Sequence, residues 1–217
     1  MKATLFRYSK YLLLLAVAVV ITNTTNTAYA AQPLSPVQRI QEVVEQSKAY
    51  IVANKDKVSE ADMIAKLKDI VSPVFDFKEM ARRCLGKNWS EGTPEQQQEF
   101  IDLFSEMLAN AYMKKVVKSI DEAEIKYPAN SEEIDGNKAT VKTIIISDGD
   151  TIAVDYRMLQ RTDLSWWAYD VIIENIGLVS NYRSEFGDII KKSGFNGLIK
   201  ALKDRIEKTK QANNKTS

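Results

Sequence analysis

Apolar residues recur at helical spacing through the first third of the chain. From Pro36 they fall three or four residues apart, which predicts a helix that runs to about Asn54. A second amphipathic segment spans residues 61–71 and is stopped by Ser72-Pro73, because the residue before a proline disfavours the helical conformation. The chain therefore begins its folded part with two helices.

The next two helices have clear start and stop signals. Asp76 is a suitable N-cap for a short helix, and Gly86 is suited to end it. Thr93 can cap a longer helix, with Pro94 at the first helical position and Gln96 where a capping box places its second partner. Behind this cap, apolar side chains recur every fourth residue at Phe100, Phe104, Leu108 and Tyr112, which predicts a wide apolar face.

After about Ile120 the pattern changes to that of strands. Residues 138–147 and 151–160 are separated by Asp148-Gly149-Asp150, which favours a tight hairpin, and Asp135-Gly136-Asn137 is a similar turn signal. Residues 166–173 alternate as a third strand, with Trp167, Tyr169, Val171 and Ile173 on one face and Trp166, Ala168, Asp170 and Ile172 on the other. These strands predict an antiparallel sheet.

Helical spacing returns from Asn181 and stops at Gly194, and a final amphipathic helix follows from about Leu198. Residues 211–217 are polar, and we expect them to be a disordered tail. No internal repeat or low-complexity linker divides the chain. The fold expected is α+β, with an antiparallel β-sheet packed against several α-helices in a single domain over residues 31–210.

The first thirty residues have the organisation of a secretory signal peptide. Lys2, Arg7 and Lys10 precede an apolar run over residues 11–21, and Ala28 and Ala30 are the small residues that signal peptidase reads. The alternative, a membrane anchor, needs about 20 apolar residues to cross the hydrocarbon core, and this run is about half as long. We expect cleavage after Ala30. No cysteine follows that point directly, so the mature chain should be free in its compartment rather than lipid-anchored.

The composition then limits the catalytic mechanisms, cross-links and ligands that the chain could use. The chain has no histidine, which excludes imidazole-activated nucleophiles, a histidine general base and histidine-ligated zinc. Cys84 is its one cysteine, so an internal disulfide is excluded. Loss of residues 1–30 removes three basic groups and leaves 27 basic against 29 acidic side chains, a balance that gives no case for nucleic-acid binding.

Residues that could do chemistry have ordinary structural explanations. Asp148 and Asp150 are typical turn residues, and the basic groups Arg82 and Arg83 are typical of a solvated surface, although they could meet a phosphate. Cys84 lies in the short predicted helix close to Met80 and Leu85, and free cysteine is among the most buried residue types. We expect no catalytic residue, metal or cofactor. Catalysis by paired carboxylates stays possible only if two of them face each other across a cleft.

Large apolar and aromatic side chains converge on the predicted sheet from several elements. Their periodicity does not distinguish a solid core from a cavity, since both need the same pattern. From the residues alone, the chain is an exported α+β domain.

Two separated motifs extend this interpretation by resemblance. Residues 75–86, followed by Trp89 and by Thr93-Pro94-Glu95-Gln96 with Phe100 and Phe104, resemble the helical signature of the MlaC family, also called toluene-tolerance proteins. Residues 167–174, then Leu178-Val179, Asn181-Tyr182-Arg183, Phe186, Gly194 and residues 197–199 resemble the second signature of that family in order and spacing. The family tends to have Glu-Gly and then Ser-Leu after the last strand, whereas this chain has Glu174-Asn175 and Gly177-Leu178.

The resemblance implies a periplasmic phospholipid carrier with an apolar lipid cavity enclosed by the sheet and helices. Such a carrier would shuttle lipid between an outer-membrane lipoprotein associated with a porin and an inner-membrane ABC transporter with a substrate-binding ring, and would maintain the lipid asymmetry of the outer membrane. The physics agrees, because a lipid crossing water exposes tens of methylenes at about 0.8 kcal/mol each. The alternatives are a periplasmic adaptor with a solid core and, further behind, a carboxylate hydrolase.

The resemblance also implies which residues bind lipid. Tyr182 and Arg183 would lie near the cavity mouth, with Arg82 and Arg83 as further phosphate candidates. The full predicted lining is Phe75, Phe77, Met80, Ala81, Leu85, Phe100, Phe104, Leu108, Tyr112, Val141, Ile145, Val154, Tyr156, Val171, Ile173, Tyr182, Arg183 and Phe186.

Overall fold

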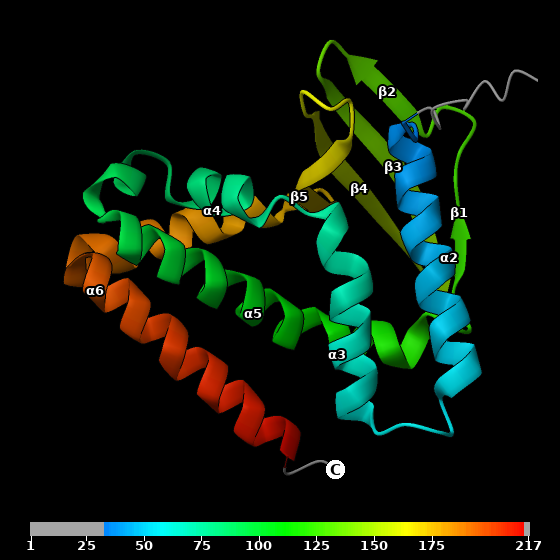
Figure 1. Ribbon diagram of the computed structural model, residues 1–217, viewed down its shortest axis with the longest axis horizontal. Coiled ribbons are helices and arrows are strands. Elements are labelled where there is room, and N and C mark those ends of the chain that lie inside the picture. The colour runs from blue at the N-terminus through cyan, green and yellow to red at the C-terminus, as the bar shows by residue number, and fades with distance from the viewer. Residues whose placement is uncertain (1–32, 215–217) are drawn as a thin grey trace, which may run out of the picture. The chain divides into compact units, whose positions relative to one another are not determined.

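The computed structural model describes residues 33–214 of the 217-residue chain (Figure 1). The predicted signal peptide, residues 1–30, lies outside the described residues, as do the last three residues of the predicted tail. No helix within residues 33–214 is both long enough and apolar enough to cross a membrane.

The described helical segments are α2 (Pro36–Asn54), α3 (Glu60–Val71), η1 (Ser72–Val74), α4 (Phe77–Leu85), η2 (Gly86–Glu91), α5 (Pro94–Ser119) and α6 (Leu178–Asn214). The strands are β1 (Glu124–Lys126), β2 (Glu132–Asp135), β3 (Lys138–Ser147), β4 (Asp150–Gln160), β5 (Trp166–Ile173) and β6 (Ile176–Gly177). The α+β class with an antiparallel sheet packed against helices is confirmed.

Local capping explains where the helices begin. The Thr93 hydroxyl accepts from the Gln96 N–H, and the Gln96 side chain accepts from the Thr93 N–H, so the predicted capping box at the start of α5 is confirmed. Asp76 caps α4, and Gly86 ends it with a φ of 55°, a conformation that glycine adopts without strain. Ser35 forms a second capping box, at the start of α2.

Helix α6 begins at Leu178, three residues before the predicted start, and is interrupted at Gly194, where φ is 67°. Gly194 therefore confirms the predicted stop as a kink between two helical pieces. The second piece continues to Asn214, into the segment predicted to be a tail. Lys210 forms a 2.9 Å ion pair with Glu106 of α5, which helps to hold this end of α6 in place.

The sheet is antiparallel, with the strand order β1-β3-β4-β5-β6 and β2 paired with β3. The β3–β4 hairpin closes through Asp148 and Gly149, which have φ values of 53° and 84°. Positive φ at both central residues is the turn type that matches the twist of the strands, and it confirms the predicted hairpin.

One part of the β5 prediction is wrong. Met158 of β4 pairs with Ala168 while Arg157 pairs with Asp170, so Tyr169 is an extra residue in a β-bulge. The bulge reverses the alternation beyond it, and Val171 shares a face with Ala168 rather than with Trp167. Simple alternation could not reveal this, because it assumes an uninterrupted ladder.

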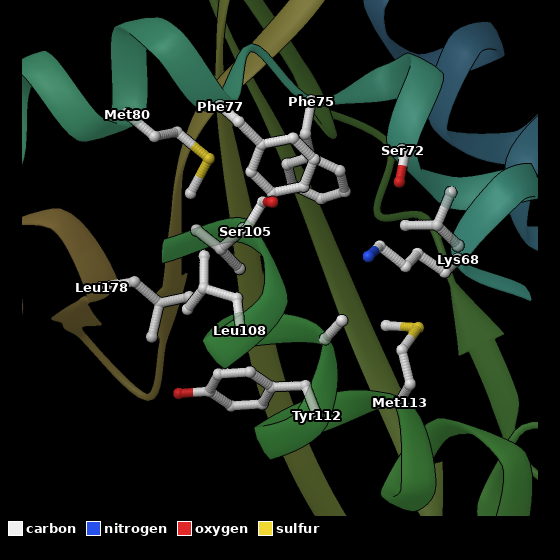
Figure 2. A pocket seen from close by; sticks show the side chains of 13 residues that line it. Lys68, Ser72, Phe75, Phe77, Met80, Ser105, Leu108, Tyr112, Met113 and Leu178 are labelled. Atoms are coloured by element: carbon white, nitrogen blue, oxygen red, sulfur yellow. The ribbon is translucent and has the colours of Figure 1, made fainter. Parts of the chain in front are cut away.

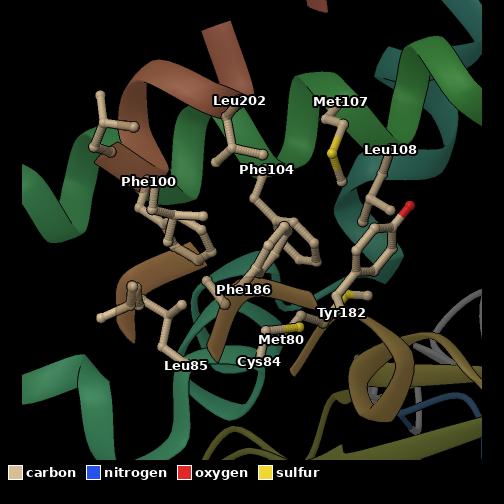
Figure 3. Close-up of a cluster of buried hydrophobic side chains, with 14 of the residues drawn as sticks. Met80, Cys84, Leu85, Phe100, Phe104, Met107, Leu108, Tyr182, Phe186 and Leu202 are labelled. Atoms are coloured by element: carbon tan, nitrogen blue, oxygen red, sulfur yellow. The ribbon is translucent and has the colours of Figure 1, made fainter. Parts of the chain in front are cut away.

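Within the part of the chain that the structure describes, buried apolar side chains form three clusters. The largest, which we call the aromatic core, joins α4, α5 and α6 around Phe100, Phe104 and Phe186 (Figure 3). A second cluster packs Ile40 of α2 and Val74 of η1 on the sheet, and a third joins α2, α3 and α5.

Candidate functional site

An apolar pocket opens between α3, α4, α5 and β5, beside the aromatic core (Figure 2). It has about 550 Å³ of empty space, part of it open to solvent. Its walls are Lys68, Val71, Ser72, Phe75, Phe77, Met80, Ser105, Leu108, Ala109, Tyr112, Met113, Val171 and Leu178.

The segment between η1 and α4 supplies two aromatic walls. The Asp76 N–H donates to the Ala168 carbonyl of β5 at 2.8 Å, and the Asp76 carboxylate pairs with Arg161 at 2.9 Å. This anchoring fixes Phe75 and Phe77 on either side of Asp76, with their ring centroids 5.9 Å apart. Both rings project into the pocket (Figure 2).

Helix α5 supplies the opposite wall. Ser105, Ala109 and Tyr112 lie three or four residues apart, as do Leu108 and Tyr112, so they occupy neighbouring positions on one side of the helix. From the sheet, Val171 reaches the pocket because the bulge at Tyr169 places it on that face. The site thus depends on a sheet irregularity as well as on helical periodicity.

The electrostatics of the pocket are simple. Among the described residues that form the wall, Lys68 is the one that carries a charge, and none is a carboxylate. Among the described residues, no three His, Cys, Asp or Glu side chains gather as metal ligands would. The arrangement is suited to hold an apolar group while a polar part stays near the opening.

Six of the residues predicted from the sequence lie in the pocket wall. They come from the η1–α4 segment, from α4, α5 and β5, and they are Phe75, Phe77, Met80, Leu108, Tyr112 and Val171.

Six others lie in the aromatic core instead: Ala81, Leu85, Phe100, Phe104, Tyr182 and Phe186. Phe100 and Phe104 are fully buried, and their rings pack edge-to-face on Phe186 at centroid distances of 5.5 and 6.0 Å. Tyr182, expected near a cavity mouth, is 4% exposed and stacks on Phe186. Burial raises the pKa of Tyr182 to about 12. These rings pack on one another, whereas Met80 and Leu108 of the same cluster also line the pocket.

The remaining strand residues share one face of the sheet. The register places Val141, Tyr156 and Val171 side by side, and Val154 beside Ile173, with Ile145 two residues beyond Thr143 on the same face. Val141 and Tyr156 pack in the cluster beneath α2, and burial raises the pKa of Tyr156 to about 12. Of these residues, Val171 alone reaches the pocket wall.

The predicted phosphate-binding arginines are engaged elsewhere. Arg82 and Arg83 both donate to Glu79, at 2.8 and 2.7 Å, and Arg83 also covers the Tyr169 ring. Arg183 donates to the Arg83 carbonyl at 2.9 Å. The structure does not bring these arginines into the pocket wall.

Sequence reasoning missed the remaining seven wall residues: Lys68, Val71, Ser72, Ser105, Ala109, Met113 and Leu178. For Ser105 and Ala109, a signal exists in their position one residue beyond the Phe104–Leu108 stripe of α5. For Lys68 and Ser72 there is none, because a charged residue near a helix end and a C-cap serine are common on any surface.

Cys84 lies in the aromatic core and is fully buried, as expected for a free cysteine close to Met80 and Leu85. Burial raises the pKa of its thiol to about 12, so the nucleophilic thiolate is suppressed.

Comparisons with known proteins agree on one family. Residues 41–204 match the family model described as MlaC protein. The chain is 25% identical over 150 residues to the toluene tolerance protein ttg2D of Pseudomonas putida, a match that covers 67% of this chain and 68% of that relative. Among solved structures, it is similar to a phospholipid-binding protein of Ralstonia solanacearum in complex with a phospholipid, with a TM-score of 0.72 and 26% identity over 79% of this chain and 96% of that one.

Proposed function

Because the chain belongs to the MlaC family, we propose that it is a phospholipid carrier of the periplasm. It would move lipid between an outer-membrane lipoprotein–porin complex and an inner-membrane ABC transporter with a substrate-binding ring, and so maintain the lipid asymmetry of the outer membrane. In this proposal residues 1–30 are the export signal, and residues 31–210 form the carrier domain. Residues 211–217 would then form the terminal tail.

The observation that carries the proposal is the apolar pocket itself. A carrier must offer acyl chains an environment of similar quality to the bilayer, because each methylene left in water costs about 0.8 kcal/mol. Walls such as Phe75, Leu108 and Val171 provide that environment. The near balance between pocket and bilayer lets lipid both enter and leave.

The solved relative supports the identity of the ligand. That protein was determined with a phospholipid bound, and it matches the present chain over most of both lengths. A hydrolase has less support, since the pocket wall contains no carboxylate pair that could act as acid and base.

The size of the pocket adds a requirement. The empty space of about 550 Å³ includes open solvent, so the enclosed part is too small for a two-tailed phospholipid. The wall formed by α3 rests on a small cluster of three buried residues, Ile51, Met63 and Leu67, compared with seventeen in the aromatic core. We therefore expect α3 to shift outward when lipid enters, while the aromatic core stays closed.

Mass spectrometry of the purified mature protein, under native conditions and after organic extraction, tests the proposal. Phospholipid near one molecule per chain is the expected result, and the extract would identify the number of tails. A protein that purifies empty and also fails to take labelled phospholipid from vesicles would contradict the carrier role and favour an adaptor.

A further inference from the structure

Lys68 differs from every other residue in the pocket wall because it carries a formal charge. It lies in the last turn of α3, and its side chain extends along the pocket toward the space between Phe75 and Met113 (Figure 2). Long basic side chains commonly bury their methylene stem against apolar surface and keep the ammonium group in water. Lys68 is exposed, so its ammonium group combines contact with the pocket and access to solvent.

No carboxylate among residues 33–214 pairs with Lys68. Nearby arginines are occupied, because Arg161 pairs with Asp76 and Arg82 and Arg83 share Glu79. Lys66 and Lys78 do not line the pocket, so Lys68 is the cation that a ligand in the pocket would meet. An ammonium group without an internal counter-ion can accept an external anion without first breaking an ion pair.

The polar surroundings of Lys68 also favour an external ligand. Ser72, which follows α3, also lines the pocket (Figure 2), and its hydroxyl makes no hydrogen bond with the described residues. The carbonyl groups at the end of α3 carry partial negative charge, which would repel an anion. The positive charge of Lys68 offsets this repulsion, so binding of an anion at this rim depends on it.

We propose that Lys68, with the Ser72 hydroxyl, binds the phosphodiester of a phospholipid whose acyl chains occupy the pocket. A phosphodiester is an anion with oxygen atoms that accept from both groups, and the ammonium is a point charge that suits it without a fixed geometry. Lys68 thus makes the site prefer an anionic head-group linkage to an uncharged lipid with the same tails. The inference rests on the proposed function, because the acyl chains supply the anchoring.

The experiment compares two probes that share the same diacylglycerol part, only one of which carries a phosphodiester-linked head group. Vesicles carry a trace of phosphatidylglycerol or of diacylglycerol, each with the same fluorescent acyl chain, and equilibrium transfer to the protein is measured. Lys68→Met removes the charge and keeps an apolar stem of similar length. It should weaken phosphatidylglycerol binding about tenfold, which corresponds to 1.4 kcal/mol, and leave diacylglycerol binding unchanged. Lys68→Arg should retain the preference, and Lys68→Glu should lose more than Lys68→Met.

Lys66→Met is the matched control, because Lys66 is exposed on the same helix but faces a separate polar groove rather than the pocket. It should bind both probes as the wild type does. Equal loss of both probes in Lys68→Met would show that Lys68 acts through packing, and no change in either probe would show that it does not contact the head group. Either result overturns the inference and leaves the carrier role intact.

Two further measurements distinguish a lipid phosphodiester from free phosphate as the ligand, and distinguish failure of this inference from failure of the carrier role. Inorganic phosphate in large excess should not displace phosphatidylglycerol, because the tails contribute most of the affinity. Displacement by phosphate would indicate a free-anion site and contradict the head-group assignment. Failure of the wild-type protein to take up either probe would overturn the proposed function and this inference with it.

Discussion

Helix α5 serves two regions that differ in how completely they are filled. Its first half contributes Phe100 and Phe104 to the aromatic core, where both rings are fully buried against α6. Its second half contributes Leu108 and Tyr112 to the pocket, where about 550 Å³ stays empty opposite α3 and β5. The same four-residue spacing builds both regions. The regions differ in what packs against α5: α6 packs closely against its first half, whereas α3 and β5 leave space beside its second half.

The aromatic core should contribute mainly to stability, and the pocket mainly to binding. In the aromatic core, close-packed rings contribute dispersion and burial, so a lost side chain leaves a cavity with a large energetic cost. In the pocket, side chains already face empty space and have fewer contacts to lose. Substitutions in the two regions should therefore affect different measurements.

The largest expected effect is in the aromatic core. Phe104→Ala should lower the free energy of unfolding by about 3–5 kcal/mol, because it removes a fully buried ring. Urea denaturation followed by circular dichroism measures this. Met113→Ala, in the pocket wall of the same helix, should lose less than half as much. Equal losses at the two positions would remove the distinction between the regions.

The next effect is at Asp170, which ties the two regions together. This carboxylate is 3% exposed, accepts from the Val179 N–H at the start of α6 at 3.0 Å, and pairs with Arg157 at 3.4 Å. Asp170→Asn keeps the shape and removes the charge, so stability should fall by about 2 kcal/mol, the scale of hydrogen bonds to charged groups. Thermal unfolding measures the loss. Unchanged stability would show that Asp170 is not the link between β5 and α6.

A substitution that fills the pocket should reduce lipid uptake strongly and change stability little. Ala109→Trp places a large side chain in empty space, so stability should change by less than about 1 kcal/mol while uptake of labelled phospholipid falls at least about tenfold. Ala111→Trp is the control, because Ala111 is exposed on the same helix. Vesicle transfer and urea denaturation, measured on both variants, give the two readouts. Lipid uptake that survives in Ala109→Trp would place the ligand elsewhere.

The smallest effect belongs to the outer face of α4, which packs between the two regions. The hydrogen bonds from Arg82 and then Arg83 lower the pKa of Glu79 below its usual value of 4.5. A lowered carboxyl pKa contributes stability above that value, and the contribution is lost as pH falls through the lowered pKa. Glu79→Gln should therefore cost at most about 1 kcal/mol at neutral pH, with a difference from wild type that shrinks below pH 4.5. Unfolding curves across the acidic range test this, and a difference that is independent of pH would contradict it.

The fold was predictable where its signals are local. The capping box of Thr93 and Gln96, the stop at Gly194 and the turn at Asp148-Gly149 depend on residues a few positions apart, and each is present. The bulge at Tyr169 has no such signal, because it is a property of the pairing between two strands.

The candidate site was only partly predictable for the same reason. An apolar stripe shows that Phe104 and Leu108 face inward, but not that the first meets Phe186 and the second faces empty space. The arginines illustrate a second limit. Arg82 and Arg83 lie within the motif that resembles the MlaC family, yet both donate to Glu79 of the same helix turn. Lys68 was overlooked because its missing partner is visible only in three dimensions.

The burial of Cys84 has a consequence for observing the protein in motion. A thiol held in the aromatic core and kept protonated reacts with an alkylating reagent only when α4 separates from α5 and α6. The alkylation rate of Cys84 therefore reports how often that opening occurs, and no label needs to be introduced. Cys84 does not line the pocket, so its reaction reports on the packing of α4 and not directly on α3, the wall that lipid would displace. A slow alkylation rate would mean that α4 stays packed in the aromatic core for long periods.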